Sequence, residues 1–479
     1  MKIKLEIEVE GEKGQDECGV LAIRASRGNI SADLMVGLMS LQHRGQESAG
    51  MATFDGAKIH NHRSMGLVSE VFDEPRLESL PGSIGIAHVR YSTTGESAAQ
   101  NAQPLPIETK AGRFVVGLNG NLVNYHSLRA DLEARGYSFS TTTDTECLGY
   151  LLAEEMNGGV KDAFTACGNI MKLLDGAYCF VVLMENGEVV VMRDPTGFRP
   201  LCIGKRGDAD VVASETTALD ALEAKFVRYV QPGEVLLLDG GMKSKIVGAS
   251  PRVAHCMFEW VYVARPDSVV EGKSVIDVRE KFGEELSAIY LDLKSRLDVV
   301  VPIPDSGRSA AYAYSRATGV RLAEALQKNR YVHRTFIMPG GEKRKRMVKL
   351  KLNVIAPLVA GKRVALVDDS IVRGTTMRRI VERVREAGAK EVHLLITCPA
   401  IISPCFMGVD FPTFEELATP GKTVERLRRE LNVDSLNYMT HEGLARCIGL
   451  PKDKLCMACI NGDYPLKTKP DIRSPRRCD

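Results

Sequence analysis

Residues 363–376 constrain the fold of this chain more than any other segment. An apolar run suited to a buried strand ends on two adjacent carboxylates, Asp368 and Asp369. A short loop with Ser, Gly and two Thr follows, and a helical pattern then runs from Met377 to a stop at Gly388. Backbone N–H groups at such a helix start can bind a phosphate, and paired acids suit sugar hydroxyls or Mg²⁺ on the same ligand. The segment predicts an α/β unit with a phosphate-binding loop.

The second half of the chain, from about Ser274, continues this alternation of strand and helix. An apolar run at 299–304 is followed by a second candidate phosphate loop at 305–308 and by a helix rich in Ala and Tyr. Another apolar run, at 392–396, comes after the helical pattern that starts at Met377 and stops at Gly388. This order is typical of a parallel sheet with crossover helices, whose ligands bind at the carboxyl ends of the strands. Both candidate loops fall at such ends.

The first half of the chain has a different pattern. Short apolar stretches bounded by turn residues occur in it, for example at 114–117, 178–183 and 233–239. Helical patterns lie between such stretches, at 33–41, 128–135 and 145–155. This mixture predicts α/β layers with mostly antiparallel strands. Because 479 residues exceed what one hydrophobic core usually serves, two domains are expected.

Charge and hydropathy exclude several classes of partner. The formal net charge is only +2, so no global field favours nucleic acid or a membrane surface. No run approaches the roughly 18 apolar residues of a membrane span, and residues 1–10 alternate without the apolar core of a signal peptide. The chain is therefore expected in the cytoplasm. Its 12 cysteines are then expected to be thiols, a nucleophile or metal ligands rather than disulfides.

Two sets of motifs resemble known families. Six motifs of the first half are similar, in one order, to those of the class II glutamine amidotransferases, which are N-terminal-nucleophile hydrolases. They lie at 17–20, 41–50, 88–95, 101–104, 119–121 and 143–146. The strand, acid pair and loop at 364–376 resemble the signature with which type I phosphoribosyltransferases bind phosphoribosyl pyrophosphate (PRPP).

Cys18 is the expected nucleophile for amide hydrolysis, which needs a thiolate, a base and donors for the oxyanion. If the chain is cut between Glu17 and Cys18, the freed α-amino group titrates near pH 8 and can act as the base. A conventional dyad with His43 or His88 is an alternative, although each is expected to be a structural histidine. Another alternative is that Cys18 is only a small buried hydrophobe.

The amidotransferase resemblance implies roles for four further residues. Asn119 and Gly120 form the oxyanion hole in this comparison. Arg90 binds the carboxylate of glutamine and Asp144 binds its ammonium group. Arginine suits the first task because its planar fork grips a carboxylate with two bonds.

The two halves in this order resemble the amidophosphoribosyltransferases over nearly the whole chain. Further motifs that carry the resemblance lie at 259–268, 302–306, 328–332, 334–340 and 350–353. The resemblance implies a two-domain α/β fold, with an αββα N-terminal-nucleophile glutaminase sandwich followed by a type I phosphoribosyltransferase domain on a parallel sheet. The implied divisions are a propeptide at 1–17, a glutaminase domain at 18–240, a phosphoribosyltransferase domain with a C-terminal cluster-binding region at 275–465, and a tail at 466–479.

The implied activity is glutamine-dependent synthesis of 5-phosphoribosylamine, the first step of de novo purine nucleotide synthesis. Glutamine is hydrolysed at Cys18, and ammonia crosses an internal channel to displace pyrophosphate from C1 of PRPP. Mg²⁺ is implied on Ser306, Asp368 and Asp369, because the charge of the departing pyrophosphate must be neutralised. The implied PRPP contacts are Asp368, Asp369, Ser370, Ile371, Val372, Arg373, Gly374, Thr375, Thr376, Lys349 and Lys351.

Two residues depart from the family pattern in the flap that closes over PRPP. Gly341 stands where Gln usually follows Pro-Gly, and Lys349 stands where Arg is usual. Lys349 keeps the positive charge but loses the two-bond grip of arginine, so the departure bears on how tightly pyrophosphate is bound.

Four cysteines form a third constellation. Cys456 and Cys459 make a C-x-x-C pair, and Cys256 and Cys405 precede it. One such pair suits zinc or redox chemistry equally well. All four positions match the cluster-binding branch of the family, which carries a propeptide and a [4Fe–4S] centre on cysteine thiolates. A structural Zn²⁺ on the same sulfurs is the alternative. The other thiols are expected in the core or on the surface: Cys147, Cys167, Cys179, Cys202, Cys398, Cys447 and Cys478.

The resemblance also implies partners and leaves two alternative functions. Purine nucleotides are expected as feedback inhibitors, and a homo-oligomer, a tetramer in the family, is expected in solution. One alternative is a different class II amidotransferase, such as a glucosamine-6-phosphate or asparagine-forming enzyme, although these have no PRPP loop. The other is a non-catalytic PRPP-sensing regulator, which would have no need of the Cys18, Arg90, Asn119 and Asp144 set.

Overall fold

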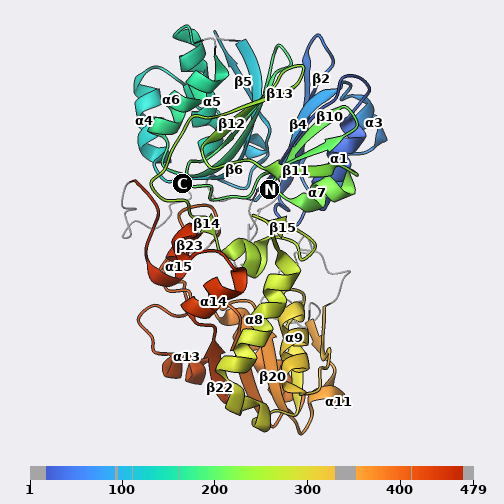
Figure 1. The fold of residues 1–479 in the computed structure, drawn as a ribbon, viewed down its shortest axis with the longest axis vertical. Coiled ribbons are helices and arrows are strands. Elements are labelled where there is room, and N and C mark those ends of the chain that lie inside the picture. The colour runs from blue at the N-terminus through green and yellow to red at the C-terminus, as the bar shows by residue number, and fades with distance from the viewer. Residues whose placement is uncertain are drawn as a thin grey trace, which may run out of the picture.

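The computed structural model describes residues 18–91, 95–110, 112–160, 162–328, 352–410 and 413–467. The expected propeptide, the flap residues Gly341, Lys349 and Lys351, and Cys478 lie outside the described residues. Within the described part, the chain forms two α/β domains, which Figure 1 shows one above the other, the first drawn from blue to green and the second from yellow to red.

Two antiparallel sheets form the centre of the first domain. The seven-stranded sheet consists of β1 (Gly19–Arg24), β2 (Ser48–Phe54), β3 (Ile59–Met65), β4 (Ile84–Arg90), β9 (Cys202–Arg206), β10 (Ala209–Ala213) and β11 (Lys225–Tyr229). The six-stranded sheet consists of β5 (Leu105–Thr109), β6 (Gly112–Leu122), β7 (Gly176–Met184), β8 (Val189–Arg193), β12 (Glu234–Leu238) and β13 (Met242–Ile246). β1 lies between β10 and β4, and β6 lies between β7 and β5, so neither is an edge strand.

Helices cover the outer face of each sheet. The seven-stranded sheet carries α1 (Ser31–Ser40), α2 (Val68–Val71), α3 (Glu74–Glu78) and α7 (Thr216–Ala221), and the six-stranded sheet carries α4 (Tyr125–Ala134), α5 (Asp144–Asn157) and α6 (Ala163–Leu173). One apolar core lies under each helical layer, and a third lies between the sheets, where Val20 and Ile203 pack with Val181 and Leu236. The expected αββα sandwich is confirmed.

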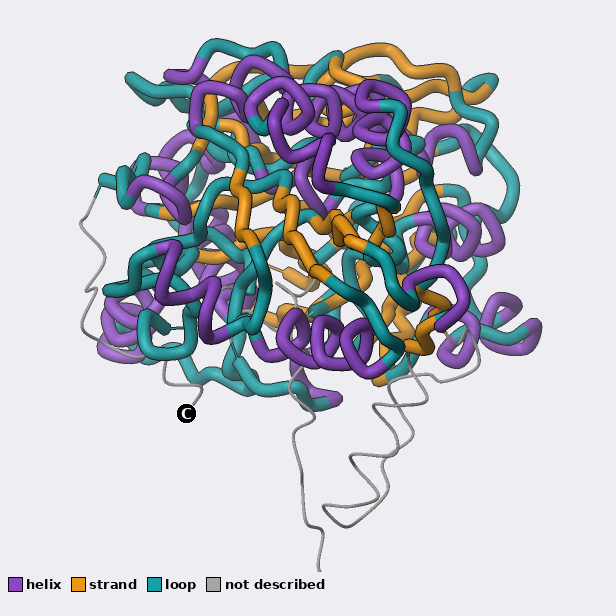
Figure 2. Tube along the Cα trace, turned by 90° about the horizontal axis from the view of Figure 1, so that it is seen from below, coloured by secondary structure: helices purple, strands orange, loops and turns teal. Residues whose placement is uncertain are grey.

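The second domain is built on a parallel sheet in the order β17-β20-β21-β22. These strands are β17 (Val299–Pro302), β20 (Arg363–Asp368), β21 (Glu391–Ile396) and β22 (Ser435–Tyr438). One face packs on α8 (Val275–Ile289), α9 (Arg308–Thr318) and α14 (His441–Ile448), and the other on α11 (Ala356–Val359), α12 (Thr375–Glu386) and α13 (Val424–Glu430). Figure 2 shows strands of the molecule running between helices when it is seen from below. The expected parallel sheet with crossover helices is confirmed.

Alternating side chains of the strands supply the two cores of this domain. Val300 and Ala365 face α8 and α9, while their neighbours Val301 and Leu366 face α12. A strand buried on both faces needs a continuous apolar run, which is why the strands of this sheet could be predicted from the sequence. Shorter elements complete the domain: β15 (Val269–Val270) pairs with β16 (Lys273–Ser274), and β18 (Leu326–Lys328) pairs with β19 (Leu352–Val354).

The two domains meet at a junction made of segments from both ends of the second half. β14 (His255–Cys256) runs parallel to β23 (Leu455–Cys456), and α15 (Ala458–Asn461) follows β23. A π-helix at Glu259–Val263 then leads towards α8. Figure 1 shows β14, β23 and α15 between the two domains. The chain therefore passes through this region on leaving the first domain and again near its end.

The last described residue, Lys467, contacts the first domain. Its Nζ donates to the carbonyl oxygens of Leu174 at 2.7 Å and Met171 at 3.2 Å, at the end of α6. Its backbone N–H donates to Oδ1 of Asp175 at 3.1 Å. An ammonium group at the carboxyl end of a helix satisfies free carbonyls and suits the helix dipole. Among the described residues, the helices are too short or too polar for any of them to cross a membrane.

Candidate active sites

Cys18 lies immediately before β1, in the interior of the first domain, with 5% of its surface exposed. Its Sγ lies 3.5 Å from the carbonyl oxygen of Tyr91. Burial raises the pKa of the thiol to about 11, and the guanidinium of Arg90 offsets part of this rise. A thiol in this state is protonated at neutral pH, so it needs a base before it can attack a carbonyl.

Arg90 and Asp144 lie beside this thiol and are both almost fully buried. Arg90 ends β4, and Asp144 begins α5 and accepts a hydrogen bond at 2.9 Å from the backbone N–H of Leu122. Burial raises the pKa of Asp144 to about 6, against the lowering effects of the Leu122 N–H and of Arg90. The structure thus brings Cys18, Arg90 and Asp144, predicted from three separate motifs, into one buried site.

Asn119 and Gly120 lie in β6, which crosses behind the nucleophile. The side-chain nitrogen of Asn119 lies 3.4 Å from Oγ of Ser214, and its buried Oδ1 has no hydrogen-bond partner. Gly120 has a φ of +144°, and a Cβ there would lie 2.0 Å from the carbonyl oxygen of Ala177. Only glycine fits this position, because any side chain would displace β6 from β7.

Ser214 and Arg44 are site residues that the sequence did not single out. Oγ of Ser214 accepts from the N–H of Val20 at 2.9 Å and so links the strand after Cys18 to Asn119. Nε of Arg44 donates to the carbonyl oxygen of Cys18 at 3.1 Å. Arg44 falls inside a recognised motif, but nothing in the motif states its task. Ser214 stands outside every motif.

Both histidines considered as a possible base have other partners. Nε2 of His88 lies 2.8 Å from the carbonyl oxygen of Leu118, and burial lowers the pKa of His88 to about 3. Nε2 of His43 lies 2.7 Å from Oε1 of Glu215. These contacts suit the structural roles expected for them rather than a Cys–His dyad.

Asp368 and Asp369 lie at the carboxyl end of β20, each 1% exposed, directly before the loop that leads into α12. Gly374 precedes α12 with a φ of +80°, a conformation that favours glycine. The hydroxyl groups of Ser306 and Ser370 both donate to the carboxylate of Asp369. The two candidate phosphate loops therefore meet at the same sheet edge, and Ser306, Asp368 and Asp369 come together there.

This group of oxygen atoms suits Mg²⁺, which commonly takes one or two carboxylates with the remaining ligands from phosphates and water.

Arg279 on α8 places a positive charge close to Asp369, and it was not identified from the sequence. Burial lowers the pKa of Arg279 to about 10, and Asp369 opposes that change. Its guanidinium also donates to the carbonyl oxygens of Trp260 and Ala264, both at 2.8 Å.

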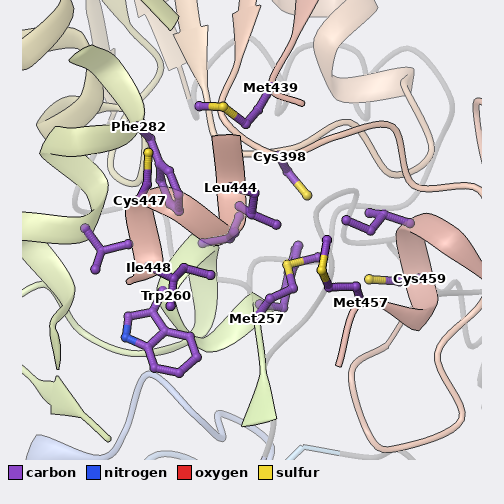
Figure 3. Close-up of a cluster of buried hydrophobic side chains, with 14 of the residues drawn as sticks. Met257, Trp260, Phe282, Cys398, Met439, Leu444, Cys447, Ile448, Met457 and Cys459 are labelled. Atoms are coloured by element: carbon purple, nitrogen blue, oxygen red, sulfur yellow. The ribbon is translucent and has the colours of Figure 1, made fainter. Parts of the chain in front are cut away.

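The four predicted cluster cysteines are buried in the junction. Cys256 is paired in register with Cys456, and the carbonyl oxygen of Cys459 accepts from Ile402 and Ser403, just before Cys405. Burial raises the pKa of Cys459 well above its ordinary value, and four neighbouring thiols add to the rise: Cys398, Cys405, Cys456 and Cys256. Figure 3 shows Cys398 in the same buried cluster as Cys459, Met257 and Met457.

The described residues hold no set of three His, Cys, Asp or Glu side chains arranged to bind a metal ion. The thiols are therefore near neighbours that do not form a ready-made metal site in this structure. Their donor chemistry nevertheless fits an iron–sulfur cluster, which takes four cysteine thiolates. The remaining described cysteines, Cys147, Cys167, Cys179, Cys202 and Cys447 together with Cys398, are buried, as expected for core thiols.

Family models match both domains. Residues 88–221 match a glutamine amidotransferase domain, and residues 274–403 match a phosphoribosyl transferase domain. The amidophosphoribosyltransferase of Methanothermobacter thermautotrophicus is 47% identical over 462 residues, which cover 96% of each chain. That of Bacillus subtilis is 43% identical over 468 residues and also covers 96% of each chain.

The chain belongs to the amidophosphoribosyltransferase family.

Solved structures agree with this assignment over the full length. A structure of the allosteric regulatory enzyme of purine biosynthesis matches with a TM-score of 0.88 at 41% identity, covering 96% of this chain and 98% of the other. The glutamine PRPP amidotransferase of B. subtilis, complexed with ADP and GMP, matches with a TM-score of 0.87 at 41% identity, covering 95% and 98%. As in other amidophosphoribosyltransferases, a glutamine amidotransferase domain precedes a phosphoribosyltransferase domain, which opposes both alternative functions.

Proposed function

We propose that this chain converts glutamine, PRPP and water to 5-phosphoribosylamine, glutamate and pyrophosphate, the first step of de novo purine nucleotide synthesis. The observation that carries the proposal is the presence of two separate candidate sites in one chain. Cys18 with Arg90 and Asp144 forms a buried thiol site in the first domain, and the acid pair at 368–369 stands before a phosphate loop in the second. In this proposal residues 18–240 form the glutaminase domain and 275–465 the phosphoribosyltransferase domain.

In the glutaminase site, Cys18 attacks the side-chain amide of glutamine. Its raised pKa means that its proton must first pass to a base, and the α-amino group of Cys18 itself is the nearest candidate once residues 1–17 have been removed as a propeptide. Arg90 binds the substrate carboxylate and Asp144 its ammonium group. The N–H of Gly120 and the amide of Asn119 donate to the oxyanion.

In the phosphoribosyl site, backbone N–H groups of the 370–376 loop bind a phosphate at the start of α12. Lys349 and Lys351 add positive charge over PRPP. Asp368 and Asp369 bind the ribose hydroxyls and, with Ser306, hold Mg²⁺. When bound, Mg²⁺ would neutralise the charge of the departing pyrophosphate.

A [4Fe–4S] cluster on Cys256, Cys405, Cys456 and Cys459 is part of the proposal. Its support is the convergence of four buried thiols from three segments, with Arg252 and Arg199 near Cys456 to offset negative charge. When bound, such a cluster would tie the exit from the first domain to the end of the chain. Neither half-reaction transfers electrons, so its expected role is structural.

Purine nucleotides are the proposed feedback inhibitors, and a homo-oligomer, a tetramer by family resemblance, is the proposed state in solution. The nucleotide proposal is supported by the B. subtilis relative, whose structure was solved with ADP and GMP.

The direct test is an assay of PRPP-dependent release of glutamate. The unchanged chain should release glutamate and form phosphoribosylamine, whereas Cys18→Ala should lose glutamine use and keep synthesis from added ammonia. Cys167→Ala, which alters a buried thiol of α6, is the matched control and should keep both activities. Loss of ammonia-dependent synthesis in a folded Cys18→Ala protein would contradict the assignment of two separate sites. Intact-mass measurement of the active enzyme should place Cys18 at the N-terminus.

A further inference from the structure

Residues 405–408 of the second domain lie against the strand that carries Asn119 and Gly120. The side-chain nitrogen of Asn121 donates to the carbonyl oxygen of Phe406 at 2.9 Å. Arg199, also from the first domain, donates to the carbonyl oxygen of Met407. A Cβ at Gly408 would lie 3.4 Å from the carbonyl carbon of Gly120. Three successive residues of one segment thus contact the first domain around Gly120.

Gly120 is consequently confined by two neighbours. The first is the carbonyl oxygen of Ala177 in β7, which would lie 2.0 Å from a Cβ of Gly120. The second neighbour is Gly408, whose φ of +104° and missing side chain allow the close approach. An oxyanion donor works only where its N–H is held in place before the charge develops. The second domain therefore supplies part of the frame that holds this backbone.

The 405–408 segment is itself held firmly. The hydroxyl of Tyr464 donates to the carbonyl oxygen of Pro404 at 2.6 Å, and the rings of Tyr464 and Phe406 are 5.2 Å apart. The N–H of Met407 lies 3.4 Å from Sγ of Cys405. Because these contacts fix the segment to the junction, it can act as a support for β6 rather than as a loose covering loop.

We propose that the 405–408 segment positions the oxyanion backbone of the glutaminase site, with Asn121 and Gly408 as positioning residues for glutamine hydrolysis. Neither residue touches the substrate in this account. Asn121 anchors the segment to β6 next to Gly120, and Gly408 provides the surface against which Gly120 rests. This inference rests on the proposed function, since it assigns a task within the glutaminase half-reaction.

The test compares Asn121→Asp and Gly408→Ala with the unchanged enzyme. Asn121→Asp keeps the size of the side chain but removes the N–H donor to Phe406. Gly408→Ala adds a methyl group 2.9 Å from Nη2 of Arg199 and 3.4 Å from Gly120. Each should lower kcat for glutamine by about 10- to 100-fold, the scale of a small misplacement of reacting groups, while KM for glutamine changes little because Arg90 and Asp144 are unaltered.

The matched control is Asn61→Asp. This change removes a side-chain N–H that donates to the carbonyl oxygen of Pro104 at 3.1 Å, a contact that lies within the first domain. It should keep the kcat of the unchanged enzyme. Ammonia-dependent synthesis should be unaltered in all three variants, which separates positioning from a general loss of structure.

Three results would overturn the inference. They are an unchanged kcat for glutamine in both variants, an equal loss of glutamine- and ammonia-dependent activity, and a rise in KM with kcat preserved. A lack of glutamate release by the unchanged chain would instead count against the proposed function, so the two failures are distinguishable.

Discussion

Arg44 and Glu259 form an ion pair that joins the first domain to the junction. Nη2 of Arg44 lies 2.7 Å from Oε1 of Glu259, and both side chains are almost fully buried. Nη1 of Arg44 also bonds Glu215, while its Nε holds the carbonyl oxygen of Cys18. Arg44 thus links the backbone of Cys18 to Glu259, which is the first residue of the π-helix.

Glu259→Ala should destabilise the protein strongly. Removing one partner of a buried pair typically costs about 3–5 kcal/mol, and the loss should fall at the lower end of this range because Arg44 keeps its contact with Glu215. Arg199, whose Nη1 lies 3.5 Å from Oε1 of Glu259, would lose a contact as well. Urea denaturation should report the change. Glu425→Ala, which removes a solvent-exposed partner of Arg428, is the control and should leave the transition nearly unaltered. Similar curves for the two variants would mean that the buried network is dispensable.

Glutamine use should rise with pH through the titration of Asp144. Its pKa in the folded protein, about 6, lies above the ordinary value of 3.8, because burial favours the neutral form. Binding of the substrate ammonium needs the ionised form, so kcat/KM for glutamine should increase as pH rises through about 6. The ammonia-dependent reaction of the same enzyme serves as the comparison. Its rate should not show the rise near pH 6 that is due to Asp144. A glutamine profile that is flat there would refute the role given to Asp144.

The same shift affects stability with the opposite sign. A carboxyl group whose folded pKa is raised binds a proton more readily in the folded state, so its contribution to the free energy of unfolding declines as pH rises from 3.8 to about 6. Asp144→Asn should remove this component from the pH dependence of thermal unfolding.

Replacing both Asp368 and Asp369 by Asn should abolish synthesis from either nitrogen source. The change removes the proposed ribose and metal contacts, whereas the thiol site in the other domain is untouched. Loss of two charge-assisted bonds at roughly 1.5–3 kcal/mol each should weaken PRPP binding by several kcal/mol, which calorimetry can measure. Glu386→Gln, at the end of α12 that is far from the loop, is a suitable control. An unaltered Kd for PRPP would exclude the acid pair from the site.

Anaerobically purified protein should be brown and contain iron. Removing the iron should lower protease resistance, because a group that binds only the folded chain stabilises it. Cys459→Ser should lose iron, and Cys167→Ser, which changes a buried thiol elsewhere, should retain it. Stoichiometric zinc without iron would favour the structural zinc alternative and leave the two active sites as they are.

The sequence revealed the parts of both sites that are local in the chain. The acid pair, loop and helix start of the second domain are consecutive, so their chemistry could be read directly, and the predicted helix from Met377 corresponds to α12. Cys18, Arg90 and Asp144 were found because each lies in a motif. The helical pattern at 145–155 likewise corresponds to α5, which extends from Asp144 to Asn157.

Contacts between distant residues could not be predicted in this way. Ser214 meets Val20 across 194 positions and Asn121 meets Phe406 across 285. Ser214 stands outside every motif, and although Asn121 lies in the 119–121 motif, nothing in that motif points to Phe406. Arg279 presents the same difficulty, since an arginine on an amphipathic helix is usually exposed, whereas this one is buried against carbonyl groups. Such contacts depend on how segments that are distant in the sequence pack together in the folded chain.

Lys467, which lies at the end of α6, gives the molecule a further mechanical attachment between its domains. Two bodies joined by one strand of chain can swing and twist about it freely. Here the polypeptide leaves the first domain after β13 and is fastened to it again by the contacts of Lys467 with Leu174 and Asp175. Together with the Arg44–Glu259 ion pair and the hydrogen bonds that Phe406 and Met407 accept from the first domain, this lysine restrains both swinging and twisting of one domain against the other.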